Sequence, residues 1–217
     1  MKKTILIAAT LCFCSMNMKA QDTTKEEGFV FTTVKENPIT SIKNQNRSST
    51  CWSFSALGFL ESELLRMGKG EYDLSEMFIV RQKYMNQMED NYLRRGKGNI
   101  GEGSLAHTFK NAYKQVGIVP EEAYSGLING NTDHNHGALC RYFKALVDAN
   151  IASKKRTPQY YSLIDNLFDT YLGKLPEKFT YKGKEYTPQS FTESLGLNMD
   201  NYIELTSFTH KPYYETF

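Results

Sequence analysis

The sequence predicts a mainly helical α+β fold, and three observations support this prediction. Five segments are expected to be helices, at about 51–67, 75–88, 105–116, 138–153 and 158–172. Apolar and polar residues alternate around Lys182-Gly183, which is typical of a small hairpin at 179–186. A short helix is expected at 188–195 and a strand at 202–208. The 217 residues are enough for one good-sized core or two small ones.

The first long helix, at 51–67, is expected to be buried, because apolar residues cover much of its circumference. These apolar residues are Trp52, Leu57, Phe59, Leu60, Leu64 and Leu65. Ser48, Ser49 and Thr50 offer side chains that could cap its start, and Gly68 supplies a stop.

Other helix ends are marked by local signals. Asp73 and Glu76 have the spacing of a capping box for the helix that begins near Ser75. A Gly-rich polar loop follows at 94–103, and another polar loop is expected at 126–137. Gly117 is expected to end the third helix, and Thr157-Pro158 is a good N-terminal pair for the fifth.

Residues 1–20 have the layout of a secretory signal peptide. Two lysines precede an apolar run from Ile5 to Cys14, and Ala20 stands before the expected cleavage site. The run is too short to cross a bilayer, so we expect no membrane span. The sequence therefore predicts an exported protein, in the periplasm or outside the cell. A lipid anchor on Cys12 or Cys14 is disfavoured, because bulky residues precede both.

The charge balance argues against some classes of partner. Removal of the leader takes away three of the 26 basic residues, which leaves 23 against 24 acidic ones. No basic stripe remains in the rest of the chain. We therefore expect neither nucleic acid nor an anionic membrane as a partner.

Two cysteines, Cys51 and Cys140, follow the leader. An exported protein with two cysteines could form one disulfide. The alternative is one reactive thiol and one buried structural thiol, and the neighbours of Cys51 favour it. Cys140 stands on an apolar-looking helix, where a buried thiol is expected.

Cys51 stands where a loop becomes a helix. A helix start favours a thiolate over a thiol, because the free N–H groups and the helix dipole stabilise negative charge there. The N–H of Cys51 has no partner within a helix and could point at a developing oxyanion. Gln45 lies six residues earlier, and its amide could supply a second donor. This combination is typical of an acyl-transfer site with Cys51 as nucleophile and Gln45 in the oxyanion hole.

The stretch 45–56 resembles the active-site signature of papain-like cysteine peptidases. That signature has a Gln six residues before the Cys, an aromatic residue after it and then small residues. The residues that fit are Gln45, Cys51, Trp52, Ser55 and Ala56, while Ser49 stands where many members have Gly. The resemblance implies a papain-like fold, peptide substrates, and no metal or organic cofactor.

Three further segments extend the resemblance over roughly residues 40–125. Residues 74–76 resemble the start of the family's second helix, and 117–124 resemble the turn after its third helix. Gly101 and Gly103, with Glu102 between them, resemble its Gly-containing substrate edge. The resemblance implies a substrate-binding role for both glycines and for Trp52, although Trp52 is expected mainly to pack.

The later part of the chain resembles the bleomycin hydrolase and aminopeptidase C branch. The segments that carry this resemblance are 172–181, 187–188 and 211–214. Residues about 126–195 insert helices and a hairpin, most of them at 138–195, that papain itself lacks. The branch implies an aminopeptidase and a possible homohexamer.

The family also needs a His base and an orienting Asn, well downstream of the Cys. The histidines of this chain are His107, His134, His136 and His210, and none has that context. We therefore expect the catalytic His and Asn to lie outside this chain. Residues 21–217 would then be the N-terminal part of a papain-like peptidase domain. It would contain mainly the helical left domain, with the right-hand β-barrel largely missing.

The predicted function is peptide hydrolysis through a thioester on Cys51, with this chain inactive by itself. Two alternatives remain: a catalytically inert papain-like module that binds peptides, and a truncated fragment that lacks the His and Asn half of the site. The segment 96–101 matches a dinucleotide fingerprint literally but follows a helical stretch, so this match is set aside. His134 and His136, beside Asp133, lack further well-spaced ligands, so we expect a solvated surface turn and no metal there.

Overall fold

The computed structural model describes residues 29, 31–154, 156–205 and 212–215. The chain divides into two compact units, 1–36 and 37–217. The described residues of the first unit form neither helix nor strand. The leader expected at 1–20 lies outside the described residues. Among the described residues, no helix is long and apolar enough to cross a membrane.

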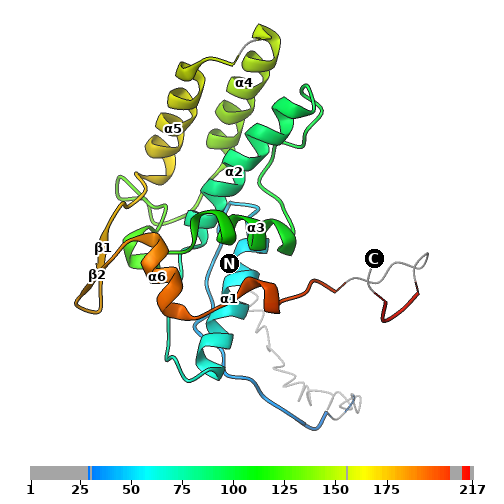
Figure 1. Ribbon diagram of the computed structural model, residues 1–217, viewed down its shortest axis with the longest axis vertical. Coiled ribbons are helices and arrows are strands. Elements are labelled where there is room, and N and C mark those ends of the chain that lie inside the picture. The colour runs from blue at the N-terminus through cyan, green and yellow to red at the C-terminus, as the bar shows by residue number, and fades with distance from the viewer. Residues whose placement is uncertain (1–28, 30, 155, 206–211, 216–217) are drawn as a thin grey trace, which may run out of the picture. The chain divides into compact units, whose positions relative to one another are not determined.

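The second unit is mainly helical, as the sequence predicts (Figure 1). Its helices and strands follow in the order α1 Cys51–Arg66, α2 Glu76–Leu93, α3 Ala106–Val116, η1 Glu121–Ala123, α4 Gly137–Ser153, α5 Pro158–Leu172, β1 Phe179–Tyr181, β2 Lys184–Tyr186, α6 Pro188–Leu195 and η2 Met199–Asn201. The strands β1 and β2 pair in antiparallel fashion, with Phe179 opposite Tyr186. They are the only sheet in the described part of the chain, which therefore contains no β-barrel.

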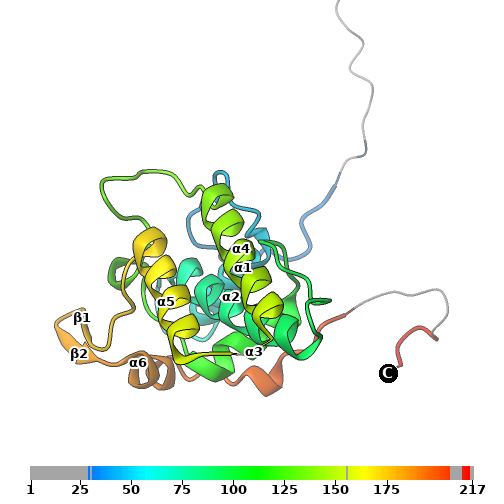
Figure 2. The ribbon, with the colours of Figure 1, turned by 90° about the horizontal axis from the view of Figure 1, so that it is seen from above.

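Helix α2 lies at the centre of the unit and packs against α1, α3, α4 and α5. Figure 2 shows α4 and α5 side by side next to α2. Because neighbours surround it, α2 is buried over most of its circumference and carries buried polar residues among its apolar ones. Tyr84 of α2 packs against Phe143 of α4 and Phe168 of α5, each with ring centroids 5.7 Å apart. These aromatic contacts hold the three helices together.

The hairpin and α6 form a smaller aromatic cluster. Phe191 of α6 is 1% exposed and contacts the rings of Phe179, Tyr181 and Tyr186. Two-stranded hairpins are marginal by themselves, so this packing is what stabilises β1 and β2. Burial of one such phenylalanine contributes about 2 to 3 kcal/mol.

Three predicted helix ends need correction. The cap of α2 is Ser75, whose hydroxyl accepts a hydrogen bond from the Phe78 N–H at 3.1 Å, and not Asp73. The same helix runs on to Leu93, beyond the expected end near residue 88. At the start of α1, Thr50 occupies the cap position without bonding the helix, because its hydroxyl pairs with that of Ser48 at 2.6 Å.

The prediction of a strand at 202–208 is wrong for its described residues. Residues 202–205 are described and belong to no strand, while 206–208 lie outside the described residues. Residues 199–205 instead lie along α3 and α1. Lys110 of α3 donates to the Tyr202 carbonyl at 2.9 Å, and the ring of Phe59 meets that of Tyr202 at 5.6 Å.

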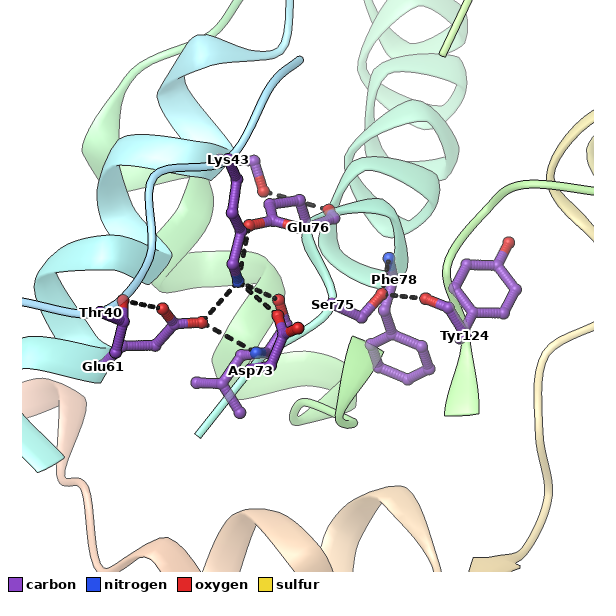
Figure 3. Close-up of polar contacts among 10 residues, drawn as sticks. Thr40, Lys43, Glu61, Asp73, Ser75, Glu76, Phe78 and Tyr124 are labelled. Carbon is purple, nitrogen blue, oxygen red and sulfur yellow. Dashed lines mark hydrogen bonds and ion pairs between the residues drawn. The ribbon is translucent and has the colours of Figure 1, made fainter. Parts of the chain in front are cut away.

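A partly buried ion cluster joins the segment before α1 to both α1 and α2 (Figure 3). The Lys43 ammonium lies 2.7 Å from the Glu61 carboxylate, 2.6 Å from Asp73 and 3.2 Å from Glu76. Glu61 is fully buried and also accepts from the Thr40 hydroxyl at 2.5 Å and the Leu74 N–H at 2.8 Å. One partly buried cation therefore serves two buried carboxylates, those of Glu61 and Glu76, and the exposed carboxylate of Asp73.

The pKa values in this cluster follow from burial and charge. Burial would lower the pKa of Lys43, but the three carboxylates outweigh it and raise the pKa above its usual value. Burial raises the pKa of Glu76 to about 7, against the attraction of Lys43. Burial also raises the pKa of Glu121 to about 8, with help from the nearby charges of Glu76 and Asp73.

Replacement of Lys43 by Met should lower the free energy of unfolding by about 3 kcal/mol, because it leaves buried carboxylates without a cation. Urea unfolding followed by circular dichroism measures this change. Lys144→Met is the matched control, since Lys144 pairs with Asp148 at 2.6 Å on an exposed surface, and should cost less than about 0.5 kcal/mol. Equal losses in the two variants would contradict a special role for Lys43.

The Glu121→Gln substitution should become more stabilising as the pH rises. The folded-state pKa of Glu121 is raised. Its contribution to the free energy of unfolding is therefore fully present below about pH 4.5 and is lost as the pH rises through about 8. Glutamine does not titrate, so over this pH range the free energy of unfolding of the variant rises relative to that of the wild type, by on the order of 2 kcal/mol. Urea unfolding of both proteins at several pH values measures the difference. A difference in unfolding free energy that does not change with pH would argue against a buried carboxyl with a raised pKa.

Candidate functional site

Cys51 is the first residue of α1 and its side chain is exposed. Within the described part of the chain, neither its Sγ nor its backbone N–H has a hydrogen-bond partner. The exposed thiol and the free N–H therefore lie together at the positive end of a 16-residue helix. This is the geometry that the sequence predicts for a nucleophile with its own oxyanion donor.

A tight turn precedes the helix and contains Gln45. The Gln45 carbonyl accepts from the Ser48 N–H at 3.2 Å and from the Ser48 hydroxyl at 2.7 Å. Asn46 has a φ of 50°, and its side-chain amide donates to Asp133 at 3.0 Å. The Gln45 side chain is half-buried, and its Oε1 is buried without a partner among the described residues. The backbone of the turn is thus fixed, and the Gln45 amide has no hydrogen-bond partner at its oxygen.

The loop with Gly101 and Gly103 is fastened to the start of α1. The Glu102 carboxylate accepts from the Ser49 N–H at 2.5 Å, and the Glu102 carbonyl accepts from Trp52 Nε1 at 3.0 Å. Trp52 is 5% exposed, so it packs, as expected, and it also positions this loop. The structure therefore brings Gly101 and Gly103 to the helix end that carries Cys51.

A groove of about 860 Å³ opens beside Cys51. It is lined by Cys51, Trp52, Ser55, Ala56, Phe59, Leu60, residues 104–107, Phe109, Lys110, Met199 and residues 202–205. Most of this lining is apolar, and Phe59 and Leu105 are each more than half exposed. Gln45, Gly101 and Gly103 do not line this groove. The predicted site residues thus meet around the start of α1, and only Cys51 and Trp52 face the groove.

No histidine within the described ranges bonds Cys51. His107 of α3 lines the same groove, but its Nδ1 lies 3.2 Å from Glu204. His134 and His136 are buried elsewhere, and His210 lies outside the described residues. The described residues thus place an exposed thiol and its unpaired N–H at the start of α1, while the nucleophile and oxyanion-donor roles of Cys51 and Gln45 stay predictions.

The prediction of a solvated turn at His134 and His136 is wrong, because both side chains are buried, with 8% and 3% exposed. The Nδ1 of His136 lies 3.0 Å from the Tyr84 hydroxyl. Burial lowers the pKa of His136 to about 4, so the ring is neutral. The hydrogen bond to the buried Tyr84 therefore holds His136, and the loop that carries it, against the core. No group of three or more metal-ligating side chains occurs among the described residues.

Cys140 of α4 is half-buried, and its Sγ donates to the Tyr84 hydroxyl at 3.6 Å. Burial raises the pKa of the Cys140 thiol to about 11. The two cysteines are both free. The sequence predicts a buried thiol at Cys140, and the structure shows a half-buried one that is hydrogen-bonded to Tyr84.

Sequence reasoning missed two residues that shape the site. In the sequence, Glu102 is marked only by the two glycines beside it, yet both its carboxylate and its carbonyl hold the loop. Lys83 is 1% exposed and donates to the carbonyls of Gly101 and Glu102. The signal for Lys83 was its helical spacing from Ile79 and Val80, which share the buried face of α2.

Comparison with known proteins gives a consistent result. Residues 29–168 match the family described as "Papain family cysteine protease". An aminopeptidase C of Lactobacillus delbrueckii subsp. lactis is 23% identical over 220 residues, which cover 82% of this chain and 49% of that protein. Human cathepsin L2 is 32% identical over 92 residues, covering 42% of this chain and 24% of the relative. The chain thus spans half or less of the length of these curated relatives.

A solved structure supports the same fold. The crystal structure of PepW from Lactobacillus rhamnosis HN001 superimposes with a TM-score of 0.59 and 18% identity. The match covers 78% of this chain and 47% of PepW. The mainly helical second unit is therefore consistent with the helical part of a papain-like fold. The chain belongs to the papain family of cysteine proteases, and its likeness to aminopeptidase C supports the bleomycin hydrolase and aminopeptidase C branch.

Proposed function

We propose that the chain carries the nucleophile half of a cysteine aminopeptidase. The observation that carries this proposal is the exposed Cys51 thiol beside its own unpaired N–H at the start of α1. The Cys51 thiolate attacks the carbonyl carbon of the scissile amide and forms a tetrahedral oxyanion. The Cys51 N–H and the Gln45 amide donate to that oxyanion. Collapse of this intermediate expels the amine and leaves a thioester on Cys51.

The departing amine must gain a proton, and a water molecule must later lose one to release the acid. In the proposed enzyme, a His oriented by an Asn does both, and these residues belong to a part of the protein beyond this chain. Aminopeptidase action is supported by the name of the relative that matches 82% of the chain. The inert peptide-binding module is the alternative that the acylation experiment below would favour if Cys51 did not react.

Cys51 should be alkylated much faster than Cys140 in the folded chain. Cys51 is exposed at a helix start, whereas burial raises the pKa of Cys140 to about 11 and restricts access to it. Iodoacetamide labelling near pH 7, read by mass spectrometry of each cysteine peptide, measures both rates. Circular dichroism first confirms that the chain is folded. Equal labelling of the two cysteines in folded chain would contradict the nucleophile assignment.

An aminoacyl 4-nitrophenyl ester should acylate Cys51 of the purified chain, whereas the matching anilide should release almost no aniline. Nitrophenolate leaves without a proton, but aniline needs one from a general acid that this chain is proposed to lack. The burst of nitrophenolate and the mass of the Cys51 thioester peptide measure the first step. Cys51→Ala should abolish both signals.

Two further variants sharpen this test. Gln45→Ala should slow the burst by about a hundredfold, because it removes an oxyanion donor. Gln189→Ala changes an exposed glutamine of α6 and should have no effect. Cys51-dependent release of aniline would show that the chain holds its own proton donor. An equal burst with N-acetylated ester would argue for an endopeptidase.

A further inference from the structure

Lys83 is a buried cation whose ammonium is bound by backbone carbonyls. Its side chain comes from α2 and is 1% exposed. The Nζ donates to the carbonyl oxygen of Gly101 and to that of Glu102, the latter at 3.1 Å. No carboxylate lies within ion-pair distance of Lys83 in the described part of the chain.

Two aromatic rings complete the surroundings of this ammonium. Its Nζ lies 5.9 Å from the centroid of the Trp52 ring and 5.0 Å from that of Tyr84. Both distances suit a cation–π contact. Burial of an ammonium without a counterion is unfavourable, and a methionine of similar length would avoid it. The structural benefit of a lysine here is that it fixes the direction of two carbonyl groups.

The loop beside the nucleophile is thereby held from behind. The Glu102 carbonyl accepts from both Lys83 and Trp52 Nε1, while the Glu102 carboxylate bonds the Ser49 N–H. Gly103 is the next residue, and its backbone N–H and C=O have no partner among the described residues. Its side facing solvent is open, because a Cβ built there would meet nothing within 4 Å. The free backbone groups of Gly103 are those an extended peptide could pair with.

We propose that Lys83 is a positioning residue for peptide binding, which turns the carbonyls of Gly101 and Glu102 inward and so presents the free backbone of Gly103 at the helix end that carries Cys51. The inference rests on the proposed function, because it assigns the bound peptide to that same site. Lys83 acts through the loop and not on the reacting atoms. Its loss should therefore weaken the use of a peptide substrate and leave the intrinsic reactivity of the thiol unchanged.

The test compares two electrophiles on the folded 217-residue chain. A dipeptidyl chloromethyl ketone, from which the Cys51 sulfur displaces chloride, uses the peptide-binding loop, whereas iodoacetamide does not. The ratio of the two Cys51 rates, each divided by the rate with N-acetylcysteine, is the peptide preference. Lys83→Met should lower this preference about tenfold, because it removes charge-assisted hydrogen bonds, and should leave the iodoacetamide rate unchanged. Lys97→Met, an exposed lysine of the same loop, is the matched control and should change neither rate.

A pH profile of the wild type gives a second readout that does not depend on the variant folding. Burial lowers the pKa of Lys83 to about 8. The side chain is therefore a charged ammonium at lower pH and becomes a neutral amine as the pH rises through about 8. The peptide preference should therefore fall as the pH rises through about 8. A change of thiol reactivity with pH affects both reagents equally and cancels from the ratio. The chloromethyl ketone used for the profile lacks the terminal amino group, which would itself titrate near pH 8.

The groups that face Lys83 do not produce this change. They are Tyr84 on α2, Cys140 on α4, His136 before α4 and Glu102 in the loop. Burial raises the pKa of Cys140 to about 11 and that of Tyr84 further, and it lowers that of His136 to about 4. The Glu102 carboxylate is bound to the Ser49 N–H.

The outcomes separate the inference from the proposed function. If wild-type Cys51 shows no peptide preference, the proposed function fails and the inference fails with it. If the preference exists but Lys83→Met retains it, only the role of Lys83 is overturned. Where the variant does not fold, seen by circular dichroism and faster Cys140 labelling, the wild-type pH profile decides, and a flat profile across pH 8 overturns the inference.

Discussion

The buried carboxylate of Glu61 determines how residues 37–50 lie against the first helix. It is fully enclosed and accepts from Lys43, Thr40 and the Leu74 N–H, so three separate segments must meet at one point. A carboxylate in such a place is tolerated only with a cation and several donors around it. Any displacement of the segment that carries Lys43 would leave this charge unpaired, and that constraint fixes the path of the chain.

The position of the nucleophile depends on this constraint. Gln45 follows Lys43 by two residues, and the turn from Gln45 to Ser48 leads directly into α1. The ends of this short path are thus held by the ion cluster on one side and by the helix on the other. Cys51 can keep an unpaired N–H and an exposed thiol because the groups before it are bonded elsewhere. The hydroxyls of Ser48 and Thr50, for example, bond each other instead of capping the helix.

Local signals sufficed to predict the helices, the hairpin and the place of Cys51 at the start of a helix, because period, caps and turn residues act over a few positions. They failed where a distant partner decides. Asp73 was expected to cap α2, but Lys43, 30 positions away in the chain, binds its carboxylate. His136 was expected in solvent, but the Tyr84 hydroxyl, 52 residues earlier, pairs with it inside the protein. The sequence does not indicate a role for Lys83, because only the folded loop shows that its ammonium meets two carbonyls.

The cations Lys43, Lys83 and Arg81, of which the last two are buried, share one structural role, which is to fasten a segment without regular structure to the helices. Lys43 joins residues 37–50 to α1 and α2, and Lys83 joins the glycine loop to α2. Arg81, 4% exposed on the same helix, donates to the Gly173 carbonyl at 2.8 Å and pairs with Asp169 at 2.8 Å, which fixes the end of α5. Apolar packing would bury these positions equally well, but it has little directional preference. A cation with two or three fixed acceptors sets the orientation of a loop, and two of these three loops adjoin Cys51.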